Sequence, residues 1–402
     1  MKTAKKILKI AGISLGALIV LAVIVICCIW SKEISNLMSF KQIKERNDGH
    51  LDGAVYQMNV KGDYYLDEFI AQGGAKNDTE LLAFISGKLT KGLVKMEIPE
   101  STINCSSFTA STKDGKRVFG RNYDFVKTNT CIVITKANRN RHASISTVDL
   151  EFLGIRGDLG VQGFTDKLLC LAAPYAPLDG INDAGLACGI YMSYQGGDVV
   201  VPTNQNTEKP DFTSTTMLRM FLDKATTVEE AVAIAQSYDM HDSASTSFHY
   251  MVADASGKSA ILEWVAETRI TDTDGSKRKL IVTYNDKDEK LGGTEAASDF
   301  QWITNFIIEP GYYDDDPEGW SIPGLDRYEM MEEELVKRNG VVQDVDDAMS
   351  ILQKVGQRKI KKNPSDPWIT VHSVIYNLTD KTATWVPNEC FYNEPFVYEL
   401  KD

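Results

Sequence analysis

The chain has 402 residues, of which 43% are hydrophobic and 25% are charged. This is the composition of a globular protein with room for one large domain or two small ones, and it excludes a fibre or a disordered chain. With 43 Lys and Arg against 56 Asp and Glu, the net charge of -13 leaves no basic surplus for phosphates, so we expect no nucleic-acid partner. The seven cysteines include no CxxC pair and no zinc-ligand spacing, and we expect no disulfide scaffold, no metal ion and no other cofactor.

The amino end carries a membrane signal. Residues 10–30 contain no charged side chain, which is the length that an α-helix needs to cross a bilayer, and several lysines precede them. We therefore predict a cytoplasmic tail (1–9), a single-pass transmembrane signal anchor (10–30) and a catalytic part outside the cytoplasm. A cleaved signal peptide is the alternative, but its apolar region is shorter and ends in a small-residue cleavage site that is missing here.

The remaining chain alternates short β-type runs with a few helices. Residues 31–50 are polar and indicate a linker or the start of a helix, followed by a strand at 54–60 and a helix at 80–93. Further strands are predicted at 118–125, 131–135, 143–148, 186–194, 248–253, 260–264, 279–284 and 370–378. Helices are predicted at 215–225, 227–238 (opened by a capping box of Thr227 and Glu230), 327–338 and 345–355. This order favours an α+β layered sandwich over alternating βαβ units.

The most informative stretch begins at Cys105. An Asp114-Gly115 pair between two alternating runs predicts a tight hairpin that brings Arg121 and Asp124 back beside Cys105. A guanidinium next to sulfur favours the thiolate and a nearby carboxylate orients a proton carrier, so the group has the parts of an activated nucleophile. The alternative from the residues alone is a small buried cysteine beside a structural ion pair.

The run CSSFTASTKDGKRVFGRNYDF resembles the start of the mature chain in the choloylglycine hydrolase superfamily of N-terminal nucleophile amidases. This superfamily includes bile salt hydrolases, penicillin V acylases, the acid ceramidase group and the isopenicillin N acyltransferases. Weaker similarities follow at the NDAGL run from Asn182, at 247–264, at the TN pair of Thr304 and Asn305, at the DR pair before Tyr328, and at 371–378, so that the resemblance covers roughly residues 50–390.

The resemblance implies a four-layer αββα sandwich in which the nucleophile becomes an amino terminus. The peptide bond between Asn104 and Cys105 would be cut by Cys105 itself, which divides the chain into a linker and prosegment (31–104) and a catalytic domain (105–402). A free α-amino group has a reference pKa of about 7.7–8.0, so the amine of Cys105 can act as the base for its own thiol. No catalytic histidine is needed, and the five histidines lie in no recognisable catalytic motif.

The family's site roles transfer by motif. Cys105 is the implied nucleophile and base, Arg121 and Asp124 hold and polarise it, Asn305 donates to the oxyanion, and Arg327 completes the charge network. The second oxyanion donor falls on Met192 when counted without gaps and on Tyr191 after a shift of one residue.

The resemblance further implies hydrolysis of a small-molecule acyl amide at its linear C-N bond through an acyl-thioester on Cys105. Transfer of the acyl group to an amine is one alternative, and a catalytically silent, membrane-tethered binding domain is another. The long segment before Cys105 is more similar to the acyltransferase and acid ceramidase groups than to bile salt hydrolases. We expect this segment to stay packed on the rest after cutting, the alternative being a zymogen that never cleaves.

Overall fold

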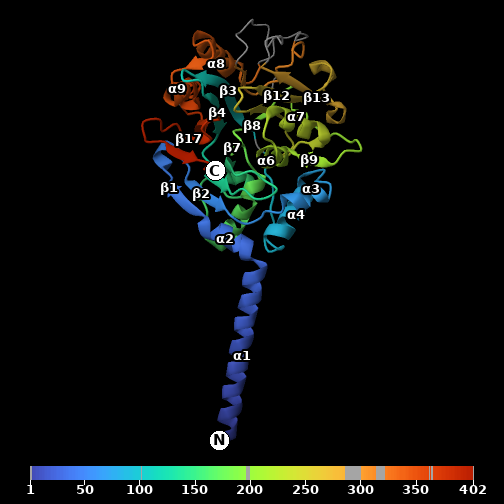
Figure 1. The fold of residues 1–402 in the computed structure, drawn as a ribbon, viewed down its shortest axis with the longest axis vertical. Coiled ribbons are helices and arrows are strands. Elements are labelled where there is room, and N and C mark those ends of the chain that lie inside the picture. Colours follow the sequence, from blue (N-terminus) through green and yellow to red (C-terminus); the bar gives the residue numbers. More distant parts are fainter. Residues whose placement is uncertain are drawn as a thin grey trace.

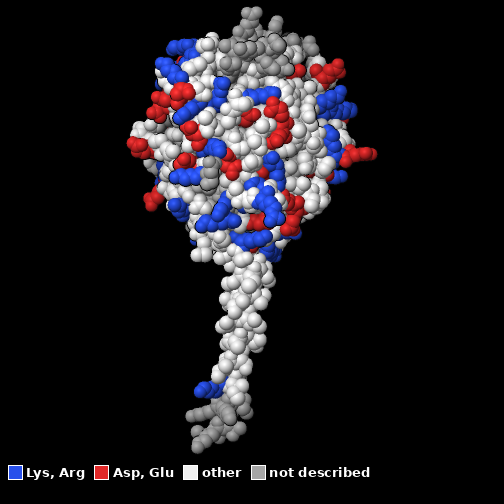
Figure 2. Space-filling view, viewed as in Figure 1, with Lys and Arg blue, Asp and Glu red and all other residues white. Residues whose placement is uncertain are grey.

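Two β-sheets packed face to face form the body of the protein, and one long helix projects from it (Figure 1). The computed structural model describes residues 2–100, 102–195, 200–285, 300–313, 322–361, 363 and 365–401. The projecting helix is α1 (Lys2–Ile29). Within the described residues, its segment Gly12–Ile29 is long and apolar enough to span a membrane, a property that signal sequences share. Figure 2 shows no charged side chain along this segment, in contrast to the mixed charges over the body.

The first sheet has nine strands in the described residues, in the order β1-β2-β5-β6-β7-β8-β11-β12-β13. Its neighbours are antiparallel except for β2 and β5, which run parallel. The strands are β1 (Lys41–Lys44), β2 (Val55–Val60), β5 (Thr130–Thr135), β6 (Ser144–Asp149), β7 (Asp179–Asn182), β8 (Ala187–Met192), β11 (Phe248–Ala253), β12 (Ser259–Val265) and β13 (Lys279–Tyr284).

The second sheet follows the order β14-β3-β4-β16-β17-β18, with β15 paired to β3. Its strands are β3 (Asn104–Thr112), β4 (Arg117–Phe125), β14 (Trp302–Ile303), β15 (Val341–Val342), β16 (Ile369–Asn377), β17 (Thr382–Pro387) and β18 (Phe396–Glu399). A separate parallel pair consists of β9 (Asp211–Thr213) and β10 (Asp239–His241). Strands β3 and β8 are in contact where the two sheets face each other.

Helices cover the outer face of each sheet. Helices α6 (Ser214–Lys224) and α7 (Val228–Ser237) pack on β7, β8, β11 and β12 of the first sheet. Helices α8 (Leu325–Lys337), α9 (Val345–Lys354) and α10 (Gln357–Ile360) pack on β3, β4, β14 and β16 of the second. The layers therefore run helix, sheet, sheet, helix, which confirms the predicted αββα sandwich.

The other helices lie at the end of the body from which α1 leaves, or in connections. They are α2 (Ser31–Ser39), α3 (Leu66–Ala71), α4 (Asp78–Leu89) and α5 (Gly163–Leu169), with short 3₁₀ turns η1 (Asp48–His50), η2 (Leu150–Leu153), η3 (Cys170–Tyr175), η4 (Arg269–Thr271) and η5 (Gly275–Lys277). Figure 1 shows α2 directly beyond α1, at the end of the body that meets it.

Two local predictions need correction. The helix predicted at 80–93 ends at Leu89, because Gly92 takes a positive φ of 76° and its N–H bonds back to the Ser86 carbonyl. The capping box at Thr227 is only half formed. The Thr227 hydroxyl accepts from the Glu230 N–H, as a capping box requires. The Glu230 carboxylate, however, accepts from the N–H of Thr226 instead of the N–H of Thr227.

Residues 31–104 contribute a strand and buried side chains to the folded body. Strand β2 lies inside the nine-stranded sheet beside β5. The Tyr64 side chain is buried, and its hydroxyl donates to Asp223 Oδ2 at 2.5 Å. At Gly53, a Cβ would lie 1.4 Å from the Thr128 carbonyl oxygen, so the two backbones meet with no room for a side chain. These contacts join the segments before and after Cys105 into one folded unit.

Candidate active site

The hairpin of β3 and β4 carries Cys105 and Arg121 on one face. Gly115 in its turn has a φ of +83°, which glycine adopts without steric cost. In the register of the pair, Cys105 lies opposite Tyr123 and Ser107 opposite Arg121. Opposed residues share a face of a sheet, as do residues two apart on one strand. The local sequence therefore brings the Arg121 guanidinium to the thiol.

The thiol of Cys105 is fully buried and contacts two groups. Arg121 Nη2 donates to Sγ at 3.3 Å, and Sγ lies 3.8 Å from the carbonyl oxygen of Ile190 on β8. Burial raises the pKa of the Cys105 thiol to about 11, with the charge of Arg121 acting in the opposite direction. In the intact chain the sulfur is thus a neutral thiol with a cation beside it.

Arg121 is itself fixed from several sides. Its Nε donates to Asp179 Oδ2 at 2.8 Å, its Nη2 donates to the Ile190 carbonyl at 2.7 Å, and the guanidinium lies 4.4 Å from the ring centre of Tyr191. The planar group has little freedom in this setting, because both an edge and a face of it are engaged.

Asp179, on β7, binds Arg121 and two further side chains. Its carboxylate also accepts from His372 Nε2 at 2.8 Å and from the Tyr376 hydroxyl at 2.6 Å, both on β16. Burial opposes its ionisation, but the neighbouring His372 and Arg121 outweigh burial and lower the pKa of Asp179 to about 2. Asp179 therefore stays ionised and supplies the counter-charge for Arg121.

The main-chain nitrogen of Cys105 has its own partners. It donates to Asn305 Oδ1 at 2.9 Å, and Arg327 Nη2 donates to the same oxygen at 2.7 Å. Arg327 Nη1 also contacts the Cys105 carbonyl oxygen and Asp124 Oδ2, the latter at 3.3 Å. Asn305 Nδ2 donates to the Met192 carbonyl at 2.8 Å. This second cluster holds the backbone of Cys105, as the first holds its sulfur.

Asp124 belongs to this second cluster and does not contact the sulfur. It lies opposite Asn104 in the hairpin register, and its carboxylate accepts from Thr370 Oγ1 at 2.6 Å and from Gln357 Nε2 at 3.0 Å. Burial raises the pKa of Asp124, with Arg327 acting in the opposite direction. Asp124 is thus linked to Cys105 indirectly, because Arg327 contacts both the Asp124 carboxylate and the Cys105 carbonyl oxygen.

The two candidate second donors lie next to each other on β8 and differ in their contacts. The Tyr191 hydroxyl donates to Ser107 Oγ at 2.6 Å, and its ring lies against Arg121. Met192 meets the site through its main-chain carbonyl, which Asn305 binds. The residues expected from motifs thus come together around one cysteine: Asn104, Cys105, Arg121, Asp124, Tyr191, Met192, Asn305 and Arg327.

The sequence reasoning missed Asp179, His372, Tyr376 and the Ile190 carbonyl. Asp179 comes three residues before Asn182, where the recognisable part of the NDAGL motif begins. The contacts of Asp179 depend on how β7 and β16 face each other across the two sheets, and these strands are far apart in sequence. No local pattern carries that information.

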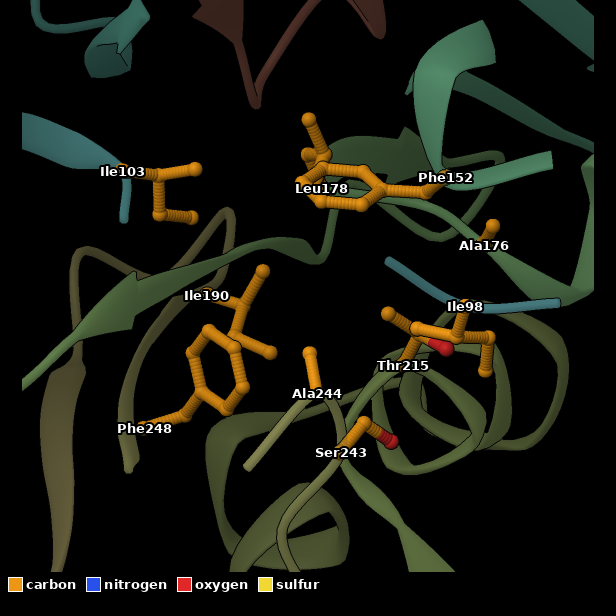
Figure 3. A pocket seen from close by; sticks show the side chains of 10 residues that line it. All are labelled: Ile98, Ile103, Phe152, Ala176, Leu178, Ile190, Thr215, Ser243, Ala244 and Phe248. Atoms are coloured by element: carbon orange, nitrogen blue, oxygen red, sulfur yellow. The ribbon is translucent and has the colours of Figure 1, made fainter. Parts of the chain in front are cut away.

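An apolar cavity is lined in part by Ile190 (Figure 3). The carbonyl oxygen of Ile190 lies 3.8 Å from the sulfur of Cys105. The cavity has a free volume of about 50 Å³. Figure 3 shows Leu178, Ile190, Phe152 and Phe248 around it. The other lining residues are Ala176, Thr215, Ser243, Ala244, Ile98 and Ile103. The last two belong to the segment before Cys105, so that segment closes the cavity in the intact chain.

One group of metal-ligating side chains occurs in the described part of the chain, at His50, Asp52 and Cys390. Asp52 is already paired there, with Arg358 Nη2 at 3.0 Å and Lys44 Nζ at 3.5 Å. Two cations on the central carboxylate disfavour a third, so we interpret the group as an ion-pair cluster that ties residues 44–52 to the carboxyl-terminal part.

The fold is a four-layer αββα sandwich, and the cluster surrounds a fully buried cysteine in the sheet that contains β3 and β4. Residues 105–271 match the model of a known family, "Linear amide C-N hydrolases, choloylglycine hydrolase family". The resemblance that the motifs indicate is thereby confirmed for this part of the chain, and with it the class of enzyme, a hydrolase of carbon-nitrogen bonds other than peptide bonds.

Solved structures with a similar course of the chain include three hydrolases. A mutant of conjugated bile acid hydrolase from Clostridium perfringens is 16% identical over 74% of this chain and 92% of its own, with a TM-score of 0.46. Penicillin V acylase from Agrobacterium tumefaciens is 17% identical over 74% and 86%, with a TM-score of 0.45. The Caenorhabditis elegans ortholog of N-acylethanolamine-hydrolyzing acid amidase is 13% identical over 74% and 100%, with a TM-score of 0.39. A comparison with curated proteins gives no significant match.

Proposed function

We propose that the chain is a self-processing cysteine amidase that hydrolyses acyl amides through an acyl-thioester on Cys105. The observation that carries the proposal is that two clusters meet at one residue. Arg121 lies 3.3 Å from the sulfur of Cys105, while Asn305 lies 2.9 Å from its main-chain nitrogen. A structural cysteine needs neither, whereas a residue that serves as nucleophile and base needs both.

Activation begins at the bond between Asn104 and Cys105. The Cys105 thiol gives up its proton and its sulfur attacks the Asn104 carbonyl carbon. The C–N bond then breaks, the Cys105 nitrogen takes up the proton to become an amine, and the acyl group of Asn104 is held on sulfur as a thioester. Water then hydrolyses this thioester, leaving a carboxylate on Asn104, the free thiol, and the free α-amine of Cys105. Arg327 and Asn305, which bind the carbonyl and nitrogen of Cys105, hold the backbone in place during this step.

Turnover uses the amine that activation creates. The amine takes the proton of the thiol, and the thiolate, favoured by Arg121, attacks the amide carbonyl of the substrate. Asn305 Nδ2 binds the Met192 carbonyl with one hydrogen and donates the other to the resulting oxyanion. The Tyr191 hydroxyl is the second donor, once it turns from Ser107 Oγ to the oxyanion. The leaving amine receives the proton, and water hydrolyses the acyl-thioester, which returns Cys105 to its free form.

The cavity supports an apolar acyl group as the substrate's acid part. Its walls are predominantly aliphatic and aromatic, and Ile190, whose carbonyl contacts the nucleophile, is one of them. After cleavage, a local shift of Ile98 and Ile103, with the rest of residues 31–104 still bound, would lengthen this space. We infer that the substrates are small acyl amides with an apolar chain, cleaved at the linear C-N bond.

We further propose that α1 anchors the enzyme in a membrane as a single-pass signal anchor, with the body outside the cytoplasm. The apolar segment of α1 and the lysines before it support this topology. Residues 31–104 act as a linker and prosegment that stays bound after cleavage. Buried contacts such as Tyr64 with Asp223, and the ion pair between Asp52 and Arg358, support retention without a covalent link.

The test is amide turnover by the full chain purified in detergent. The substrates are N-acyl derivatives of 7-amino-4-methylcoumarin with chains from acetyl to palmitoyl, and mass spectrometry of quenched protein looks for an acyl group on Cys105. We expect coumarin release that Cys105→Ala abolishes and that Cys131→Ala, at another buried cysteine, retains. No release by the wild-type chain from any substrate in the set would contradict the proposal.

Addition of hydroxylamine to the same reaction separates hydrolysis from acyl transfer. If water alone resolves the thioester, the free acid stays the main product. If the hydroxamate dominates at low amine concentration, the enzyme is an acyltransferase with the same nucleophile. A folded chain without any thioester would instead support the silent binding domain.

A further inference from the structure

His249 and Glu263 form a fully buried pair that the proposed chemistry does not use. They lie on the neighbouring strands β11 and β12, and His249 Nδ1 is 2.9 Å from Glu263 Oε1. A charged pair removed from water is costly unless its remaining polar atoms also find partners. Those partners therefore indicate what the pair does.

Within the described residues, the remaining hydrogen-bond partners of His249 and Glu263 are main-chain atoms of one short segment, residues 304–309. His249 Nε2 donates to the carbonyl oxygen of Thr304 at 3.0 Å. Glu263 Oε1 accepts from the N–H of Ile308 and Oε2 accepts from the N–H of Glu309, each at 3.0 Å. The two ring nitrogens of His249 thus face two different oxygen atoms, one on Glu263 and one on Thr304.

Asn305 lies between these anchor points. The pair holds the residue just before it and two residues shortly after it, so it fixes the backbone from which the Asn305 amide extends. That amide must reach Cys105 with Oδ1 and the oxyanion with Nδ2, and Oδ1 already lies 2.9 Å from the Cys105 nitrogen. The His249 ring also meets the Tyr191 ring edge to face, with centres 5.8 Å apart. The pair thus touches the supports of both proposed oxyanion donors.

We propose that His249 and Glu263 are positioning residues that fix the Asn305 amide for oxyanion stabilisation. The inference rests on the proposed function, because Asn305 acts as a donor only in that reaction. The pair is connected to the reacting atoms through the 304–309 backbone and makes no contact of its own with Cys105 in the described structure. A displacement of about 1 Å in a reacting group is enough to cost about 100-fold in rate.

The test compares Glu263→Gln and His249→Gln with Tyr250→Phe in the full chain. Glu263→Gln keeps the size of the side chain but removes one acceptor oxygen. Tyr250→Phe is the matched control, because Tyr250 is buried and lies one residue along the same strand. The change removes a hydroxyl that contacts the Ser214 carbonyl at 3.0 Å and Met240 Sδ at 3.8 Å. Urea unfolding checks that each variant is folded before kinetics on the coumarin amides.

We expect kcat to fall about 100-fold in both pair variants, with KM changed less than about twofold, and kcat to stay near wild type in Tyr250→Phe. This split is the mark of an interaction made in the transition state, provided that kcat is calculated on the folded fraction that urea unfolding gives for each variant. Unchanged kcat in folded variants would overturn the inference. So would failure of both variants to fold, because the pair would then serve stability.

The wild-type chain separates this inference from the proposed function. If the wild type neither cleaves before Cys105 nor releases coumarin, the proposed function fails. If it does both, and the pair variants match Tyr250→Phe in kcat, then only the positioning role fails.

Discussion

Replacement of Asp179 by Asn tests whether the site depends on a buried counter-charge for Arg121. The ionised carboxylate accepts bonds from Arg121 and His372 at 2.8 Å and from Tyr376 at 2.6 Å. Its pKa is lowered from 3.8 to about 2, and each pKa unit corresponds to about 1.4 kcal/mol, so ionisation contributes about 2 kcal/mol to stability at neutral pH. The loss of one partner from a buried pair costs up to about 5 kcal/mol.

We therefore expect Asp179→Asn to lower the free energy of unfolding by about 2–5 kcal/mol and to abolish most turnover, because the guanidinium beside the thiol loses its anchor. Urea unfolding followed by tryptophan fluorescence measures the first effect, and coumarin release measures the second. Asp183→Asn is the control, four residues along the chain. Its carboxylate is partly exposed and pairs with His142 at 2.6 Å, so its removal should cost about 1 kcal/mol or less.

The contribution of Asp179 to the free energy of unfolding should also change with pH in a defined direction. Because the pKa of Asp179 is lower in the folded state than in the unfolded state, its contribution is complete above about pH 4 and is lost as the pH falls through about 2. The difference between wild type and Asp179→Asn should therefore be constant from about pH 7 to pH 5 and shrink below about pH 4. Equal stability and activity for Asp179→Asn and Asp183→Asn would refute the reasoning.

Three further variants follow from the structure. Burial raises the pKa of Asp149 to about 7, so the folded state holds this proton more tightly than the unfolded state. Stability should therefore rise as the pH falls from about 8 to 5, and urea unfolding of Asp149→Asn should show a flatter profile. Asp124→Asn removes the partner of Arg327 and should slow cleavage before Cys105 about 100-fold in a time course on gels, whereas wild-type cleavage would contradict its role. Gly53→Ala forces a Cβ to 1.4 Å from a backbone oxygen and should destabilise by about 3 kcal/mol or more, whereas Gly87→Ala, with open space at its Cβ, should not destabilise.

The local parts of the fold could be predicted from the sequence, because their signals are local. The Asp114-Gly115 turn and the alternation around it define the β3–β4 hairpin, and that hairpin alone brings Arg121 to Cys105. The succession of strands and helices also predicts a layered α+β sandwich, whereas the αββα order of its layers is implied by the family resemblance. Strands β17 and β18 were missed because the first ends in proline and the second is short, which weakens the strand pattern.

The contacts between distant strands could not be predicted in this way. Asp179 and His372 meet across the two sheets from positions 193 residues apart, and nothing near either residue indicates the other. The motifs suggested Asn305, but not the pair that holds its backbone, since His249 and Glu263 belong to strands without any catalytic signature. Their importance depends on register and burial, which only the folded chain shows.

The central claim is that Cys105 becomes an amino terminus, and intact mass with amino-terminal sequencing of the purified full chain tests it most directly. We predict two fragments that remain together in gel filtration, one of which begins at Cys105, and a single uncut chain for Cys105→Ala. A wild-type chain that stays intact through Asn104 and Cys105 over a range of pH and reducing conditions would contradict the account, because the base for its thiol would not exist.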